Sequence, residues 1–143
     1  MARLARSALP AQGIYHVTAR GVARGPIFLD DEDRTGFVGL LQRVTERLLW
    51  KCHAYCLMDN HYHTIVETQL QSLSRGFHRI NGIHAQQFNE RHARVGHLFQ
   101  ERFHAQVVRD DEHLANTCEY IWNNPVRVGR CATAADWPWN GAF

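Results

Sequence analysis

Two histidines one residue apart follow an Asp-Asn pair in the stretch Asp59-Asn60-His61-Tyr62-His63. The composition of residues 61–67 favours a β-strand. Because strand side chains alternate between faces, His61 and His63 should point to one side and Tyr62 to the other. Two imidazoles on one face can chelate a divalent cation. They can equally be half-exposed strand residues in a chain with ten histidines, and the spacing alone leaves both interpretations open.

A later segment, residues 110–125, has helical periodicity and two polar side chains four residues apart, Tyr120 and Asn124. Residues at this spacing project together from a helix. They belong to a polar stripe that lies apart from the apolar stripe of Leu114, Cys118 and Ile121. The alternative is an amphipathic tyrosine at a helix edge and an asparagine that ends the helix before proline.

If the polar stripe faces the histidine pair, His61, His63 and Asn124 form a partly open, three-ligand site. Such a site can hold magnesium or manganese, with substrate oxygens and water completing the coordination shell. Tyr120 would stand beside the cation as a nucleophile. The chemistry implied by this arrangement is transesterification at a phosphodiester.

These side chains need a scaffold, and the periodicity of the chain supplies one. Alternating β-rich segments predict strands at residues 13–20, 50–58, 61–67 and 102–109, with a tight turn at Asp59-Asn60. Amphipathic segments predict helices at about residues 30–49, 73–92 and 110–125, although Gly76 and Gly82 weaken the second. The order β-α-β-β-α-β-α predicts an α+β, ferredoxin-like fold with a four-stranded, mainly antiparallel sheet, two crossing helices and an extra C-terminal helix carrying the tyrosine.

Length and composition restrict the class of protein. At 143 residues, with 45% hydrophobic and 21% charged residues, the chain is expected to form one globular domain over residues 1–143. No apolar run is long enough to cross a membrane, and the first thirteen residues lack the apolar segment of a secretory signal. We therefore expect a cytoplasmic protein whose four cysteines are reduced thiols.

The charge pattern favours a polyanionic partner. The net charge is only 16 − 14 = +2, but residues 71–100 contain four arginines and four histidines against one acid, Glu90. The candidate phosphate contacts are five arginines, and for each a solvated surface charge is an equally good interpretation: Arg20, Arg24, Arg75, Arg79 and Arg102. Glu67 is expected on the histidine side of its strand, either as a partner of the site or as an exposed strand end.

A structural zinc site is a rival use of the histidine pair. Cys52 and Cys56 are expected to share a strand face and could join His61 and His63. They are spread far along the strand and lack the C-x-x-C spacing of zinc sites. Small buried hydrophobic residues are the better interpretation of these two cysteines.

Four segments together resemble the REP-associated tyrosine transposases, within the single-tyrosine HUH transposases. The segments are YHVTARG at 15–21, AYCLMDNHYH at 54–63, LSRG to GHLFQERF at 73–103, and YIWNNPVR at 120–127. The His-hydrophobe-His pattern alone is a weak signal. Its combination with GHLFQxRF and YIxxNPVR is highly specific and covers most of residues 14–130.

The resemblance implies a function for each of these residues. His61 and His63 would be the HUH metal ligands, with Asn124 as the polar third ligand, and the metal would be magnesium or manganese. Tyr120 would attack a phosphate of single-stranded DNA beside a hairpin or palindromic repeat, leaving a 5′-phosphotyrosine and a free 3′-hydroxyl. The protein could act as a homodimer. The alternatives left open are an HUH endonuclease that mobilises nothing and a non-catalytic module that binds single-stranded nucleic acid.

Overall fold

The computed structural model describes residues 12–143, so most of the N-terminal segment inspected for a signal lies outside the described residues. The strands are β1 (Gln12–Arg20), β2 (Lys51–Leu57), β3 (His61–Gln69), β4 (His104–Val108) and β5 (Asn140–Gly141). The helices are α1 (Asp31–Arg47), α2 (Leu70–Arg91), α3 (Asp111–Trp122) and α4 (Asn124–Arg127), with short 3-10 turns η2 (Val22–Arg24) and η3 (Ala134–Asp136). Within residues 12–143, no helix combines the length and apolarity that a membrane span requires.

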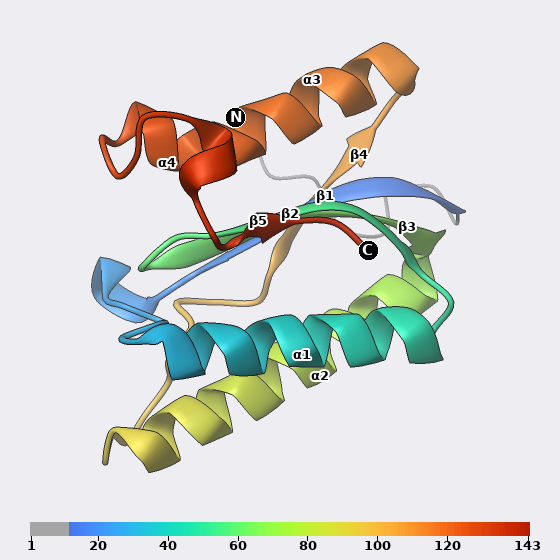
Figure 1. Cartoon of the computed structure of the whole chain (residues 1–143). Coiled ribbons are helices and arrows are strands. Elements are labelled where there is room, and N and C mark those ends of the chain that lie inside the picture. The colour runs from blue at the N-terminus through green and yellow to red at the C-terminus, as the bar shows by residue number, and fades with distance from the viewer. Residues whose placement is uncertain (1–11) are drawn as a thin grey trace.

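The strands form one antiparallel sheet in the order β4-β1-β3-β2-β5. Figure 1 shows α1 and α2 packed on one face of this sheet and α3 on the other. The first four strands have the order of a ferredoxin-like fold, so the predicted α+β architecture is confirmed. The fifth strand was not predicted. It forms where the C-terminal segment returns to the sheet, with the Trp137 indole donating to the Leu57 carbonyl at 3.0 Å.

The alternation of side chains along each strand separates a core face from a polar face. On β1, Tyr15 and Val17 are buried against α1 and α2, whereas His16 lies on the α3 side. On β3, Tyr62 is fully buried in the same α1/α2 core. Its hydroxyl donates to Asn81 Oδ1 at 2.7 Å. The predicted placement of the two histidines on one face and Tyr62 on the other is confirmed.

The second long helix is continuous through both glycines that weakened its prediction, and it begins earlier, at Leu70. Gly76 has a packing reason. A Cβ atom at this position would collide with the Trp50 indole, whose ring stacks on Phe77 with centroids 5.1 Å apart. The glycine therefore allows α2 to approach the start of β2 closely, and tertiary packing outweighs its low helix propensity.

The expectation that Cys52 and Cys56 share a strand face is wrong. The pairing of β2 with β3 shifts register between Cys52 and Ala54, so one extra residue, His53, enters the strand. A bulge of this kind reverses the faces of all residues after it. Cys52 is buried in the α1/α2 core and Cys56 in the cluster beneath α3. The two thiols therefore cannot join the histidine pair in one zinc site.

The last helix is also shorter than predicted. It ends at Trp122, and a separate helical turn, α4, starts at Asn124 with Pro125 near its beginning. Proline lacks the N–H that would continue the hydrogen bonding of α3, whereas its fixed φ suits the first turn of a new helix. Asn123, between the two helices, keeps helical dihedral angles (φ −87°, ψ −2°), so Asn124 still follows Tyr120 by about one helical turn.

Candidate active site

Strand register places a row of polar side chains on the α3 face of the sheet. Thr18 on β1 pairs with His63 on β3 and, on its other side, with His104 on β4. Arg20, two residues further along β1 and on the same face, pairs with His61. Because side chains on the same face of paired strands are neighbours, the ferredoxin-like strand order brings together residues more than 80 positions apart.

Two adjoining cavities run over this row of side chains. The first has a volume of about 490 Å³ and is lined by Tyr120 as well as His16 and His63. The second, of about 430 Å³, is lined by both HUH-pattern histidines and by three of the candidate arginines, Arg20, Arg24 and Arg102. The two cavities have four lining residues in common: Thr18, His63, His104 and Gln106. We refer to the two cavities together as the groove.

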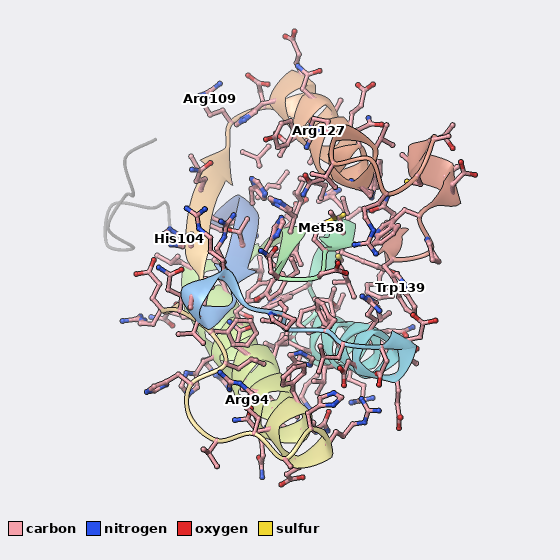
Figure 2. The ribbon with its side chains drawn as sticks, turned by 90° about the vertical axis from the view of Figure 1, so that its left-hand side faces the viewer. Met58, Arg94, His104, Arg109, Arg127 and Trp139 are labelled. Carbon is pink, nitrogen blue, oxygen red and sulfur yellow. The ribbon has the colours of Figure 1, made fainter. Side chains whose placement is uncertain are left out.

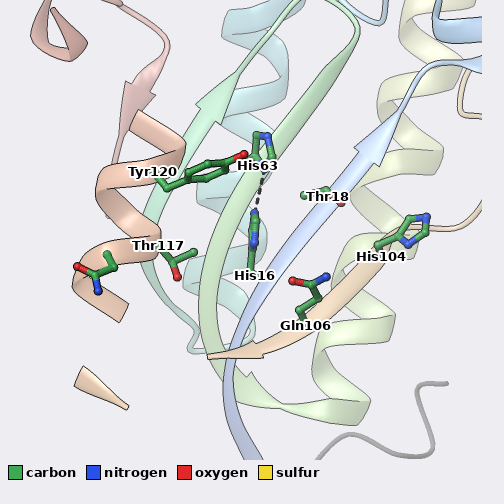
Figure 3. Close-up of a pocket in the computed structure, with 8 residues that line it drawn as sticks. His16, Thr18, His63, His104, Gln106, Thr117 and Tyr120 are labelled. Atoms are coloured by element: carbon green, nitrogen blue, oxygen red, sulfur yellow. Dashed lines mark hydrogen bonds between the residues drawn. The ribbon is translucent and has the colours of Figure 1, made fainter. Parts of the chain in front are cut away.

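Tyr120 reaches the groove from α3. Cys118 and Ile121 bury the apolar side of this helix against the sheet, with Leu114 packed at the margin, which confirms the predicted apolar stripe. Tyr120 remains 57% exposed. Figure 3 shows it projecting from α3 over the sheet, with its hydroxyl directed towards His63. Tyr120 and His63 therefore face one cavity within a single chain, and His61 lines the adjoining one.

A guanidinium covers the tyrosine ring. The central carbon of Arg127 lies 4.0 Å from the centroid of the Tyr120 ring, within the range of a cation–π contact. Figure 2 shows Arg127 in the layer formed by α3 and α4, across the sheet from Arg94. The turn α4 thus adds a fixed positive charge next to the phenol.

Asn124 contacts the first histidine of the pair. Its Nδ2 lies 3.1 Å from His61 Nε2, and the other ring nitrogen, Nδ1, lies 2.7 Å from Asn60 Oδ1. Since an amide oxygen only accepts, His61 donates through Nδ1 and keeps a lone pair on Nε2. Asn124, at the start of α4, lies within hydrogen-bond distance of that lone pair.

The electrostatic environment keeps the site histidines neutral. Burial, together with the positive charge of Arg20, lowers the pKa of His61 to about 4. Burial also holds the pKa of His63 well below its usual value, with His16, His61, Arg127 and Arg20 acting in the same direction. Neutral imidazoles offer lone pairs to a cation at physiological pH.

Comparison with known proteins identifies the family. Residues 11–124 match the family described as IS200-like transposases. The chain belongs to this family. A Haemophilus influenzae protein assigned as a REP-associated tyrosine transposase is 27% identical over 139 residues, which cover 90% of this chain and 78% of that protein. The resemblance to REP-associated tyrosine transposases is thus confirmed.

Solved structures agree on the fold. The structure of a REP-associated tyrosine transposase bound to a REP hairpin superposes with a TM-score of 0.75 at 19% identity, covering 98% of this chain and 82% of that chain. A Deinococcus radiodurans protein assigned as a transposase superposes with a TM-score of 0.53 at 14% identity, covering 86% of this chain and 97% of that one. The transposase fold therefore extends over nearly the whole chain.

The donor set of this IS200-like transposase fits a divalent cation. His61 Nε2 and the Asn124 amide face each other, and rotating the amide by half a turn would present its oxygen in place of its nitrogen. The Nδ1 atoms of His61 and His63 are both engaged, by Asn60 and His16, which leaves Nε2 on each ring for coordination. Two imidazoles and an amide oxygen leave further positions for phosphate oxygens and water.

Elsewhere in residues 12–143, the only cluster of three acidic, histidine or cysteine side chains with metal-compatible spacing is Asp30, Asp33 and His92, whose ligand atoms lie within 4.8 Å of one another. The Arg91 guanidinium already bonds both carboxylates of this cluster. His92 bonds the buried Asp33 at 2.8 Å. A cation would have to displace a paired arginine here, so this cluster is better understood as an ion-pair network that joins α1 to α2.

The predicted phosphate contacts separate into two groups. Arg20, Arg24 and Arg102 line the groove. Arg75 and Arg79 are exposed on α2, which covers the opposite face of the sheet, and the structure does not bring them to the histidine pair. Glu67 accepts a hydrogen bond from His53 at 2.9 Å, at the far end of β3, and is not a partner of the site.

Sequence reasoning missed three features of the groove. His16, on β1, contacts His63 at 2.9 Å. Arg127 covers the tyrosine. His104 bonds Glu101 at 2.6 Å on the wall opposite Tyr120. His16 and Arg127 both lie inside segments that carried the resemblance, YHVTARG and YIWNNPVR, but nothing in the local spacing links either residue to the histidine pair.

Proposed function

We propose that this IS200-like transposase cleaves and rejoins single-stranded DNA beside hairpins of palindromic repeats, through a covalent tyrosine–DNA intermediate. The observation that carries the proposal is the shared groove of Tyr120 and His63, with His61 and Asn124 in contact at its side. We infer that residues 1–143 act as a single catalytic domain, since both hydrophobic cores pack on the same sheet.

In the proposed reaction the Tyr120 oxygen forms a bond to phosphorus as the bond from phosphorus to the 3′ oxygen breaks. The phenol proton leaves to solvent, and the 3′ oxygen takes up a proton to become a free hydroxyl. The products are a 5′-phosphotyrosine and a 3′-hydroxyl end. Because the phosphotyrosine remains a phosphodiester, attack by a 3′-hydroxyl can rejoin DNA without a nucleotide cofactor.

His61, His63 and Asn124 would hold a magnesium or manganese ion. When bound, such an ion polarises the phosphoryl oxygens and stabilises the leaving oxygen. The chain itself supplies the orientation. The α3 helix holds the phenol over the sheet, and the guanidinium of Arg127 provides positive charge beside the position where a phosphate must lie.

The DNA strand would follow the groove across β3, β1 and β4. Arg20, Arg24 and Arg102 line the end of the groove beyond the histidines, where they can contact backbone phosphates. The solved relative bound to a REP hairpin supports hairpin DNA as the substrate class. Arg75 and Arg79 would require a duplex that reaches the α2 face, and their role as DNA contacts stays a prediction.

The decisive experiment is formation of a covalent adduct. The protein is incubated with single-stranded oligonucleotides that carry palindromic hairpins, in manganese or magnesium, and analysed on a denaturing gel. We expect an adduct with the wild type and with Tyr55→Phe, a tyrosine on β2 outside the groove. We expect none with Tyr120→Phe, and none with His61→Ala because the cation site is weakened.

The absence of any adduct across varied hairpins, with DNA binding retained, would favour the rival function of a non-catalytic single-strand binding module. Tyr120 and His63 line one cavity of a single chain, and Asn124 contacts His61 of the same chain, which supports a site that does not need the possible homodimer to complete it. Dimer formation and a cytoplasmic location stay predictions.

A further inference from the structure

His16 lies diagonally across the sheet from His63. It comes from β1, where Thr18, two residues further on, is the direct partner of His63. The His16 Nε2 and His63 Nδ1 atoms are 2.9 Å apart, and the two rings are stacked with centroids 5.1 Å apart and planes 26° apart. Figure 3 shows the two imidazoles joined by this hydrogen bond at the base of the Tyr120 cavity.

The direction of this hydrogen bond decides what His63 can do. A neutral imidazole carries one proton, on either Nδ1 or Nε2. If His16 donated, His63 would accept on Nδ1 and carry its proton on Nε2, which would then have no lone pair for a cation. If His63 donates from Nδ1, its Nε2 is free to coordinate. His16 must then accept on Nε2 and carry its own proton on Nδ1.

We propose that His16 is a positioning residue for the cation site: it accepts a hydrogen bond from His63 Nδ1 and thereby fixes the ring orientation and tautomer of His63. This inference rests on the proposed function, because it requires that His63 is a metal ligand. His16 thus has a chemical role within the YHVTARG segment in addition to its place in the β1–β3 pairing.

The other histidine of the pair shows the same arrangement from a different source. His61 donates from Nδ1 to the Asn60 side-chain oxygen at 2.7 Å, and His63 has His16 as a potential acceptor at its own Nδ1. In both rings Nε2 is then left for coordination. Metal-binding histidines commonly donate their second nitrogen to such a partner, and loss of that partner lowers metal affinity by about 10- to 100-fold. Asn60 is adjacent in sequence to its histidine, whereas His16 reaches His63 only through the pairing of β1 with β3.

The test uses two substitutions of His16 that differ in the acceptor. His16→Phe keeps a flat ring against His63 and removes the acceptor. His16→Gln places an amide oxygen near the former Nε2 position and restores it. Manganese binding to the metal-free, DNA-free protein is measured from the paramagnetic resonance signal of free Mn²⁺. We expect His16→Phe to bind Mn²⁺ about 10- to 100-fold more weakly than wild type and His16→Gln to recover most of the affinity.

The matched control is His53→Phe, which removes a β2 histidine that is hydrogen-bonded to Glu67 outside the groove. It should bind Mn²⁺ as the wild type does. Nitrogen NMR of the histidine rings adds a readout that needs neither activity nor a variant. In the wild type, His63 should carry its proton on Nδ1, and an NMR-active cadmium isotope should couple to Nε2 of His61 and His63 only.

Three results would overturn the positioning role. One is wild-type Mn²⁺ affinity in a folded His16→Phe protein, and another is a His63 proton found on Nε2 in the metal-free wild type. The third is cadmium coupling to a nitrogen of His16, which would make that residue a ligand itself. If the wild type itself binds no Mn²⁺, the cation site of the proposed function is refuted as well. Failure of the proposed function and failure of the His16 role alone are therefore distinguishable.

Discussion

Buried neutral histidines should make the metal-free protein sensitive to mild acid. Burial lowers the pKa of His16 to about 4, with the charge of His113 acting in the same direction. Burial and Arg20 lower the pKa of His61 to about 4. In the unfolded chain both imidazoles should titrate near about 6.5. Below that pH the unfolded state binds protons that the folded state does not, so stability is complete above about pH 6.5 and is lost progressively as the pH falls towards 4.

The magnitude follows from these pKa values. Between about pH 7.5 and pH 5, a histidine whose pKa falls from 6.5 in the unfolded state to 4 in the folded state costs about 2 kcal/mol of unfolding free energy. For His16 and His61 together the loss is about 4 kcal/mol, which is a large part of the stability of a domain of this size.

The assay is urea unfolding in a metal chelator at both pH values. We compare the wild type with His16→Gln and with His16→Gln/His61→Gln, because the side chain of glutamine does not titrate. The single variant should lose about 2 kcal/mol less than the wild type on acidification, and the double variant about 4 kcal/mol less. Equal losses in all three proteins would show that the two imidazoles are already hydrated in the folded state, and the argument from burial would be refuted.

Three further predictions concern other parts of the molecule. Tyr62→Phe leaves the side-chain oxygen of Asn81 without its donor and should lower the unfolding free energy, measured in urea, by about 1 kcal/mol. Adduct formation should be unchanged, because Tyr62 lies on the face of the sheet opposite the histidine pair. Loss of the adduct would contradict this assignment of faces. Gly76→Ala forces a methyl group into the Trp50 ring and should lower the unfolding free energy by about 1–3 kcal/mol in the same assay. Gly82→Ala has open space around it and should be neutral or stabilising. Similar losses at both glycines would contradict the packing argument. Arg127→Gln removes a charge beside the phosphate and should slow adduct formation by about 10-fold or more. The affinity for Mn²⁺ should stay within a few-fold of the wild-type value. An unchanged rate in single-turnover assays would remove this residue from the site.

The residue chemistry and the local geometry could be read from the sequence. Alternation places His61 and His63 on one face of a strand. The turn at Asp59-Asn60 is local too, and the observed hairpin closes there with a hydrogen bond from Met58 N to His61 O at 2.9 Å. The apolar stripe of α3 likewise follows from helical spacing. All these features depend on neighbours within a few residues, so sequence patterns are sufficient to predict them.

Contacts between distant segments were decided only by the tertiary structure. The bulge at His53 moved Cys52 to the face opposite Cys56 and removed the zinc alternative. The register of β1 against β3 brought His16 to His63, 47 residues away. Strand pairing and the docking of α3 depend on how whole faces fit together, and a one-residue shift in register would separate every one of these side chains. The sequence by itself determined which groups could do the chemistry, whereas the packing of the sheet and helices decided which of them meet.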